Sequence, residues 1–127
     1  MKIFSIRKSQ EFKDINKKGK KFYSKTLILT ISKPTNNFSD QRTIKLKSDS
    51  DDFCRVGYIV SKKVSKLAVK RNKIKRRFRE AFRRSLKNNL IKKNCDYIII
   101  ARFSAVNTDY LSIIKDLEFC LKESNKL

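Results

Sequence analysis

The sequence predicts an α+β domain in which helices pack on a mixed β-sheet. Two apolar patterns alternate along the chain: a period of two, typical of strands, and a spacing of i, i+4, i+7 and i+8, typical of a helix docked on a core. The 127 residues include two glycines and one proline, which favours regular structure, and 39% are hydrophobic, enough for one modest core. We therefore expect a single domain over residues 1–127 with the element order α-β-β-β-α-β-α.

The first half of the chain supplies a helix and two clear strands. Residues 9–18 carry Phe12 and Ile15 at helical spacing, between a serine that can cap a helix and Gly19, a type favoured just after a helix. Residues 26–32 alternate with a period of two and are rich in β-branched side chains, which predicts a strand ending near Pro34. Residues 54–60 predict a second strand.

A polar insertion separates these two strands, from about residue 33 to residue 53. Four of the twelve acidic residues of the chain lie in it. We expect a long loop or a hairpin extension here, and the weak alternation over residues 42–47 is compatible with one further strand.

The second half of the chain predicts a long helix, a strand and a last helix. The long helix runs from residue 67 to about residue 90. Residues 95–101 are almost continuously apolar, as in a central strand buried on both faces. The last helix follows a capping region at Thr108 and Asp109, and its apolar stripe contains Leu111, Ile114, Leu117, Cys120 and Leu121.

The long helix has two distinct faces. On a helical wheel, Ile74, Phe78, Ala81 and Phe82 form one narrow apolar face that should dock on the sheet. A second stripe, about 100° wide, points away from the docked side. It consists of Asn72, Lys75, Arg76, Arg79 and Arg83.

The charge of the chain implies a polyanionic partner. There are 33 basic against 12 acidic residues, a net charge of +21, whereas solubility alone asks for a magnitude of about 2 to 8. Residues 61–93 hold fifteen basic residues and one acidic residue, Glu80, a net charge of +14. A merely solvated helix face would intersperse glutamate with lysine at i, i+4. Nucleic acid is the first candidate for the partner, and an anionic membrane is the second.

The residue inventory excludes several kinds of chemistry. The chain has no histidine and no CxxC pair, so a zinc site of the usual type and a Ser-His or Cys-His nucleophile are excluded. We expect Cys54, Cys95 and Cys120 to be buried thiols. No apolar run approaches the ~20 residues of a membrane span, and the N-terminus lacks the apolar core of a secretory signal, so we expect a cytoplasmic protein. Arg71, near the docked side of the long helix, is either a buried ion-pair partner at the helix start or part of an anion site.

The basic helix also carries an ordered motif, which follows Ser61-Lys62-Lys63 and reads Val69-Lys70-Arg71-Asn72-Lys73-Ile74-Lys75-Arg76. It resembles the signature of the bacterial ribonuclease P protein component, whose Arg-Asn-Arg motif appears here as Arg71-Asn72-Lys73. Phe12, Gly19, residues 56–63 and residues 96–102 match further landmarks of that family in order. The resemblance covers nearly the whole chain outside the insertion.

The resemblance implies the non-catalytic protein subunit of a ribozyme endoribonuclease. The RNA subunit, with Mg²⁺ bound mainly by RNA, would hydrolyse a phosphodiester of precursor tRNA and release the 5′ leader. The protein would bind that RNA 1:1 and would carry no catalytic residue. We expect no organic cofactor, and the few, scattered acidic residues form no visible metal-binding cluster, so no residue is assigned to a metal. The family fold also implies a left-handed βαβ crossover through the motif helix, of the kind known from a ribosomal protein domain.

Two groups of site residues follow from the motif, the cationic stripe and the resemblance. The RNA-binding group consists of Lys62, Lys63, Arg71, Asn72, Lys73, Lys75, Arg76, Arg79 and Arg83. The group expected in the cleft for the single-stranded leader, between the first helix and the sheet, consists of Phe12, Ile28 and Thr30.

The chain departs from the family pattern at three positions. Lys73 stands for the usual arginine and loses a bidentate fork. Asn16 and Thr30 stand where the family has aromatic residues, which predicts weaker or differently placed leader contacts. Phe22 or Tyr23 could substitute as a stacking surface, and a core role is the alternative for each.

Two other classes of protein share part of this pattern. A structural RNA-binding protein of ribosomal type would have the same composition, but it has no reason for this ordered motif. A basic membrane-active helix would need a broad exposed apolar face, whereas Ile74, Phe78 and Phe82 are needed by the core. The sequence therefore favours the ribonuclease P protein over both.

Overall fold

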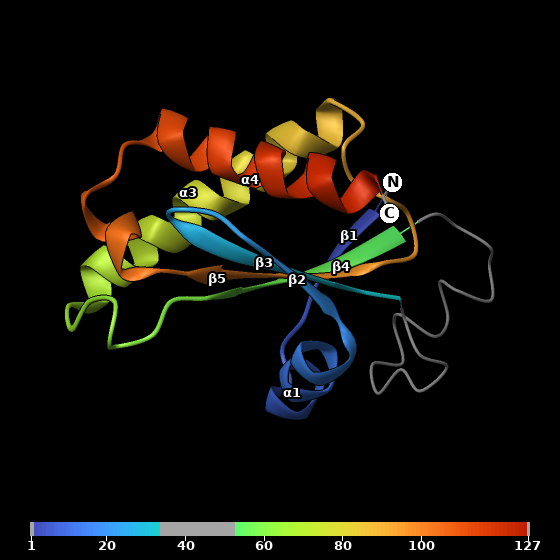
Figure 1. Ribbon diagram of the computed structural model, residues 1–127. Coiled ribbons are helices and arrows are strands. Elements are labelled where there is room, and N and C mark those ends of the chain that lie inside the picture. Colours follow the sequence, from blue (N-terminus) through green and yellow to red (C-terminus); the bar gives the residue numbers. More distant parts are fainter. Residues whose placement is uncertain (1, 34–52, 127) are drawn as a thin grey trace.

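The computed structural model describes residues 2–33 and 53–126 (Figure 1). Five strands, three α-helices and a 3₁₀ helix make up these two segments. In chain order they are β1 (Lys2–Ser5), α1 (Ser9–Lys18), β2 (Lys20–Tyr23), β3 (Leu27–Ser32), β4 (Phe53–Ile59), α3 (Ala68–Lys87), β5 (Asp96–Ala101), η1 (Phe103–Asn107) and α4 (Tyr110–Asn125).

The strands form one mixed sheet in the order β1-β4-β5-β3-β2. β4 pairs with β1 and β5 in parallel, and β3 pairs with β2 and β5 antiparallel. The apolar strand β5 is central, as its composition predicts. Because α3 connects the parallel neighbours β4 and β5, it lies in a βαβ crossover, whose left-handedness stays a prediction.

Helices cover both faces of the sheet (Figure 1). α3 and α4 lie on one face and enclose the larger core cluster, which includes Leu29, Tyr97 and Leu117. α1 lies on the opposite face, over a smaller cluster centred on Ile15 and Ile98. The α+β class and the docking of helices on a mixed sheet are confirmed.

The sequence did not predict two of the strands, β1 and β2. β1 and β2 are four residues long, and each has three exposed residues and one half-buried residue. Both lie at sheet edges, where a strand is defined by hydrogen bonds to its one neighbour and needs no apolar run. The strand considered for residues 42–47 and the rest of residues 34–52 lie outside the described residues. Phe53, expected at the end of the insertion, is the first residue of β4.

α1 has the predicted bounds, residues 9–18, but its two caps differ from expectation, and α3 ends earlier than expected. Lys8, not Ser9, is the N-cap of α1, and it provides no side-chain cap. Gly19 has a φ of −78°, which any residue can adopt. A glycine is needed because the chain passes close to β3, where a Cβ on residue 19 would lie 2.7 Å from Thr30 Cγ2. α3 ends at Lys87, before the expected residue 90, because Asn89 takes a positive φ of 59°. The cap of α4 is confirmed, since Asp109 accepts from the Ser112 amide.

Candidate nucleic-acid interface

The apolar face of α3 holds the helix on the sheet. Ile74, Phe78, Ala81 and Phe82 are each at most 3% exposed, and Phe82 meets Tyr97 of β5 edge to face, with ring centroids 5.6 Å apart. The predicted docking face is therefore confirmed. This packing fixes the rotation of α3 and thereby the direction in which its charged side points.

The expected RNA-binding residues lie on α3 and on the loop before it. Arg71 and Lys75 are half-buried. The exposed members are Lys62, Lys63, Asn72, Lys73, Arg76, Arg79 and Arg83. A rigid helix thus presents a stripe of cations, and the only acidic residue within α3 is Glu80, whose exposed pair with Arg83 at 3.1 Å contributes little.

Arg71 fastens the loop that carries Lys62 and Lys63. Its Nη1 donates to the carbonyl oxygens of Ser65, at 3.0 Å, and Lys66, at 2.9 Å. The ion-pair alternative for Arg71 is therefore wrong, because its partners are backbone carbonyls. These bonds hold the loop against the first turn of α3, which carries the motif.

Tyr58 of β4 is a contact that the sequence analysis missed. The Arg79 guanidinium lies over its ring, 5.7 Å from the centroid. Burial raises the pKa of the Tyr58 phenol, and the charge of Arg79 opposes that rise. A hollow of about 220 Å³ opens beside this pair, lined also by Ile3 and Arg83, so Arg79 is oriented by an aromatic ring at the rim of a surface depression.

The α1 side of the sheet carries a row of half-buried isoleucines across three neighbouring strands. The pairing register places Ile28 beside Ile100 and Ile100 beside Ile59. We call Ile28, Ile100 and Ile59 the isoleucine row. On the outer strand, Tyr23 pairs with Ile28 and extends the row to the β2 edge.

Two of the three expected cleft residues are accessible. Phe12 and Ile28 are half-buried, and the Phe12 ring lies directly over Gly57, where a Cβ would be 2.3 Å from the ring. Thr30 is fully buried, beneath the end of α1 where Gly19 contacts it. Contrary to expectation, Thr30 supports α1 from below, and its side chain is not presented to a ligand.

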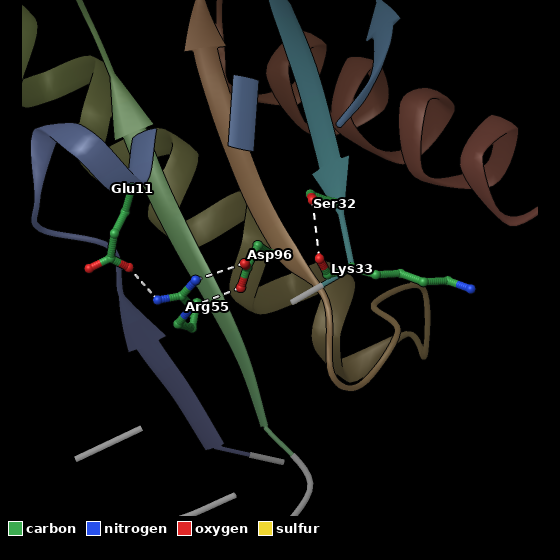
Figure 2. Close-up of polar contacts among 5 residues, drawn as sticks. All are labelled: Glu11, Ser32, Lys33, Arg55 and Asp96. Atoms are coloured by element: carbon green, nitrogen blue, oxygen red, sulfur yellow. Dashed lines mark hydrogen bonds and ion pairs between the residues drawn. The ribbon is translucent and has the colours of Figure 1, made fainter. Parts of the chain in front are cut away.

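A buried charge cluster fixes α1 against the sheet (Figure 2). Arg55 of β4 makes a bidentate pair with Asp96 of β5, with both N–O distances 2.8 Å, and an ion pair with Glu11 of α1. Burial opposes the charge of Arg55, but its bonds to Asp96 and Glu11 prevail and raise the pKa of the guanidinium. No local sequence pattern indicates this cluster, since Asp96 and Glu11 lie 41 and 44 positions from Arg55.

The described residues show neither a metal-binding cluster nor a membrane-spanning helix, and the cysteines are buried. Within residues 2–33 and 53–126, no cluster of three or more cysteine and acidic side chains is arranged to hold a metal ion. The three cysteines are free and buried, as predicted, and burial raises the pKa of Cys54 to about 12. Among the described helices, none is long and apolar enough to cross a bilayer.

Comparison with known proteins decides the family. The family model for ribonuclease P matches residues 2–125. The chain belongs to the ribonuclease P protein family. The ribonuclease P protein component of Clostridium botulinum (strain Langeland) is 36% identical over 121 residues, which cover 95% of this chain and 90% of that protein. The component of Rickettsia bellii is 39% identical over 122 residues, covering 91% and 95%.

Solved structures of the ribonuclease P protein family share the fold. The Staphylococcus aureus RNase P protein superimposes with a TM-score of 0.72 at 31% identity, over 95% of this chain and 94% of that one. The Thermotoga maritima RNase P protein gives a TM-score of 0.71 at 26% identity, over 94% and 96%. The chain is thus a subunit of ribonuclease P, a tRNA-processing endoribonuclease, and the ribosomal-type alternative is set aside.

Proposed function

We propose that this ribonuclease P protein binds the RNA subunit through α3 and the preceding loop, and the 5′ leader of precursor tRNA across the α1 side of the sheet. The observation that carries the proposal is the cationic stripe on a helix whose opposite face is fully buried. The two surfaces would hold catalytic RNA and substrate in one complex, with one protein per RNA.

The RNA subunit is matched by the stripe on α3. Cations on a docked helix keep fixed spacings and can register against successive phosphates. Arg76, Arg79 and Arg83 add planar forks that bind phosphate bidentately. Asn72, uncharged within the stripe, can donate to and accept from a base edge or a ribose hydroxyl.

The leader is matched by the isoleucine row and Phe12. Proteins bind single strands by stacking bases on aromatic side chains within a positively charged groove. Phe12 supplies an aromatic ring here, and the isoleucine row supplies an apolar floor for the base faces. The buried charge cluster of Arg55, Asp96 and Glu11 keeps α1 beside the isoleucine row. Lys62 and Lys63 follow soon after Ile59 in the chain, so both proposed surfaces meet near the end of β4.

In this proposal the chain positions RNA and transfers no proton. Mg²⁺ held mainly by RNA would supply the activated water and the charge neutralisation for phosphodiester hydrolysis. The protein residues bind phosphates and orient the leader. They also lower the Mg²⁺ requirement, because their positive charge offsets repulsion between the two RNAs.

Reconstitution tests the proposal. The protein is added to a bacterial ribonuclease P RNA at low Mg²⁺, and cleavage of precursor tRNA at the mature 5′ end is measured. We expect accurate processing to be restored. Arg76→Glu should abolish most of the stimulation, whereas Lys115→Glu, the same charge change at an exposed position of α4, should not. No stimulation by the wild-type protein would refute the function, and equal losses in both variants would refute the role of the stripe.

A further inference from the structure

We propose that Tyr23 is a stacking platform for a base of the single-stranded leader, at the β2 end of the isoleucine row. The inference rests on the proposed function, and it chooses Tyr23 over Phe22, the two aromatic residues that the sequence offered as stacking surfaces. It is carried by strand register, exposure and the charges around the ring.

The structure separates Tyr23 from its neighbour Phe22. Phe22 pairs with Leu29, and it packs against the core on the α3 and α4 side of the sheet. Tyr23 pairs with Ile28 and points to the α1 side, where it is 59% exposed. Successive side chains of a strand alternate between faces. Phe22 is therefore a core residue, and Tyr23 is left available to a ligand.

Continuity with the isoleucine row distinguishes Tyr23 from an ordinary exposed tyrosine. Single apolar side chains on a surface are common and need no explanation. Here the ring ends a line of four paired side chains, Tyr23, Ile28, Ile100 and Ile59, on four adjacent strands. At about 4.8 Å between strands, the line is roughly 14 Å long. It is thus an apolar track with an aromatic ring at one end.

Cations lie near both ends of this track. At the Tyr23 end, Arg102 Nη1 donates to the carbonyl oxygen of Ser24, the next residue, at 2.9 Å, and Lys21 is exposed on the same face of β2. At the other end, Lys62 and Lys63 come three and four positions after Ile59 and are exposed. A negatively charged backbone can therefore run along the track with a positive group near each end.

This combination of an open ring and flanking cations fits single-stranded nucleic acid. Every base has a π-face, so stacking on tyrosine tolerates any leader sequence. Base-paired RNA is a poor fit, because its base faces are covered by neighbouring pairs. The expected ligand is thus the unpaired leader, and the paired body of the tRNA should make no contact with Tyr23.

The test uses protein assembled with ribonuclease P RNA and compares precursor tRNA with mature tRNA lacking the leader. Replacing one stacking residue by alanine costs about 5- to 150-fold in affinity. Tyr23→Ala should therefore weaken precursor binding within that range and leave mature tRNA binding unchanged. Tyr23→Phe should retain wild-type affinity. Phe119→Ala removes an aromatic ring of similar exposure, 54%, on α4, and should have no effect.

A fluorescence measurement gives an independent readout. The chain has no tryptophan, so Tyr23→Trp introduces a single reporter. A leader oligonucleotide should change its emission on binding to the assembled enzyme, and a Phe119→Trp reporter should not respond.

The outcomes separate the inference from the proposed function. If the wild-type protein stimulates processing but Tyr23→Ala binds the precursor normally, or weakens both tRNAs equally, the role of Tyr23 is refuted and the proposed function stands. If the wild-type protein gives no stimulation, the proposed function fails, and the inference fails with it.

Discussion

Arg55→Leu should destabilise the fold strongly, because it removes the cation at the centre of a buried cluster. The side chains of Arg55 and Asp96 are 8% and 4% exposed, and that of Glu11 is 15% exposed. Leucine replaces the guanidinium with an apolar side chain and leaves the Asp96 carboxylate buried beside it. Burial of an ion without its partner is costly, since water is not available to solvate it.

The magnitude can be worked from this geometry. Removing one partner of a buried ion pair costs about 3–5 kcal/mol. Unfolding entropy is about 2.1 cal/mol/K per residue, or roughly 0.27 kcal/mol/K for this chain. The melting temperature should therefore fall by roughly 11–19 °C. Typical total stability is about 5–15 kcal/mol, so the loss is between about a fifth and the whole of it.

Thermal and urea unfolding followed by circular dichroism measure this effect. Arg83→Leu is the matched control, because it breaks the exposed pair with Glu80 and should cost about 1 kcal/mol or less. The double variant Arg55→Leu/Asp96→Leu should recover part of the loss, since it leaves one fewer buried charge. The reasoning would be refuted if Arg55→Leu lowered the melting temperature by less than about 4 °C, or if the losses of the two single variants were additive in the double variant.

Three further predictions concern packing, binding and pH. Gly57→Ala should cost about 1–3 kcal/mol in urea unfolding, because the new Cβ would displace the Phe12 ring; additive losses with Phe12→Ala would argue against that contact. Arg76→Ala should make the log–log salt dependence of RNA binding shallower by about 0.7–0.9, one phosphate's contribution, whereas an unchanged slope with lost stability would mark Arg76 as structural. Burial raises the pKa of Cys54 from about 9 to about 12, so its contribution to stability is present below pH 9 and lost as the pH rises to 12. The urea midpoint of the wild type should therefore fall relative to Cys54→Ala between pH 9 and pH 11, and parallel curves would contradict this.

Elements with strong local periodicity were predictable from the sequence. The strands β3, β4 and β5 and the helices α1, α3 and α4 each carry an apolar repeat or an apolar run that is visible within the segment. β1 and β2 were missed because each edge strand has one half-buried residue out of four. The end of α3 was misplaced by three residues, because the backbone turn at Asn89 has no counterpart in the apolar pattern.

In the candidate site, too, some residues were predictable from the periodicity of one helix, and others depend on contacts between elements. The exposed side of α3 follows from helical geometry once the buried side is known, so most of the expected RNA-binding residues are on the surface. Thr30 was misjudged because its burial depends on the close approach of Gly19, eleven positions away. The contact of Arg79 with Tyr58 joins a helix to a strand, and periodicity within either element does not indicate it.

The sequence by itself determined that α3 docks with Ile74, Phe78 and Phe82 and presents cations on its other side, because a helix repeats every 3.6 residues and both stripes are contained in one segment. The ordered motif around Asn72 likewise indicated the family. Only the tertiary structure decided that Tyr23 continues the isoleucine row and that Arg55 clamps α1. The physical reason is register: hydrogen bonds between strands set which residues are neighbours, and a shift of one residue would turn Tyr23 to the opposite face.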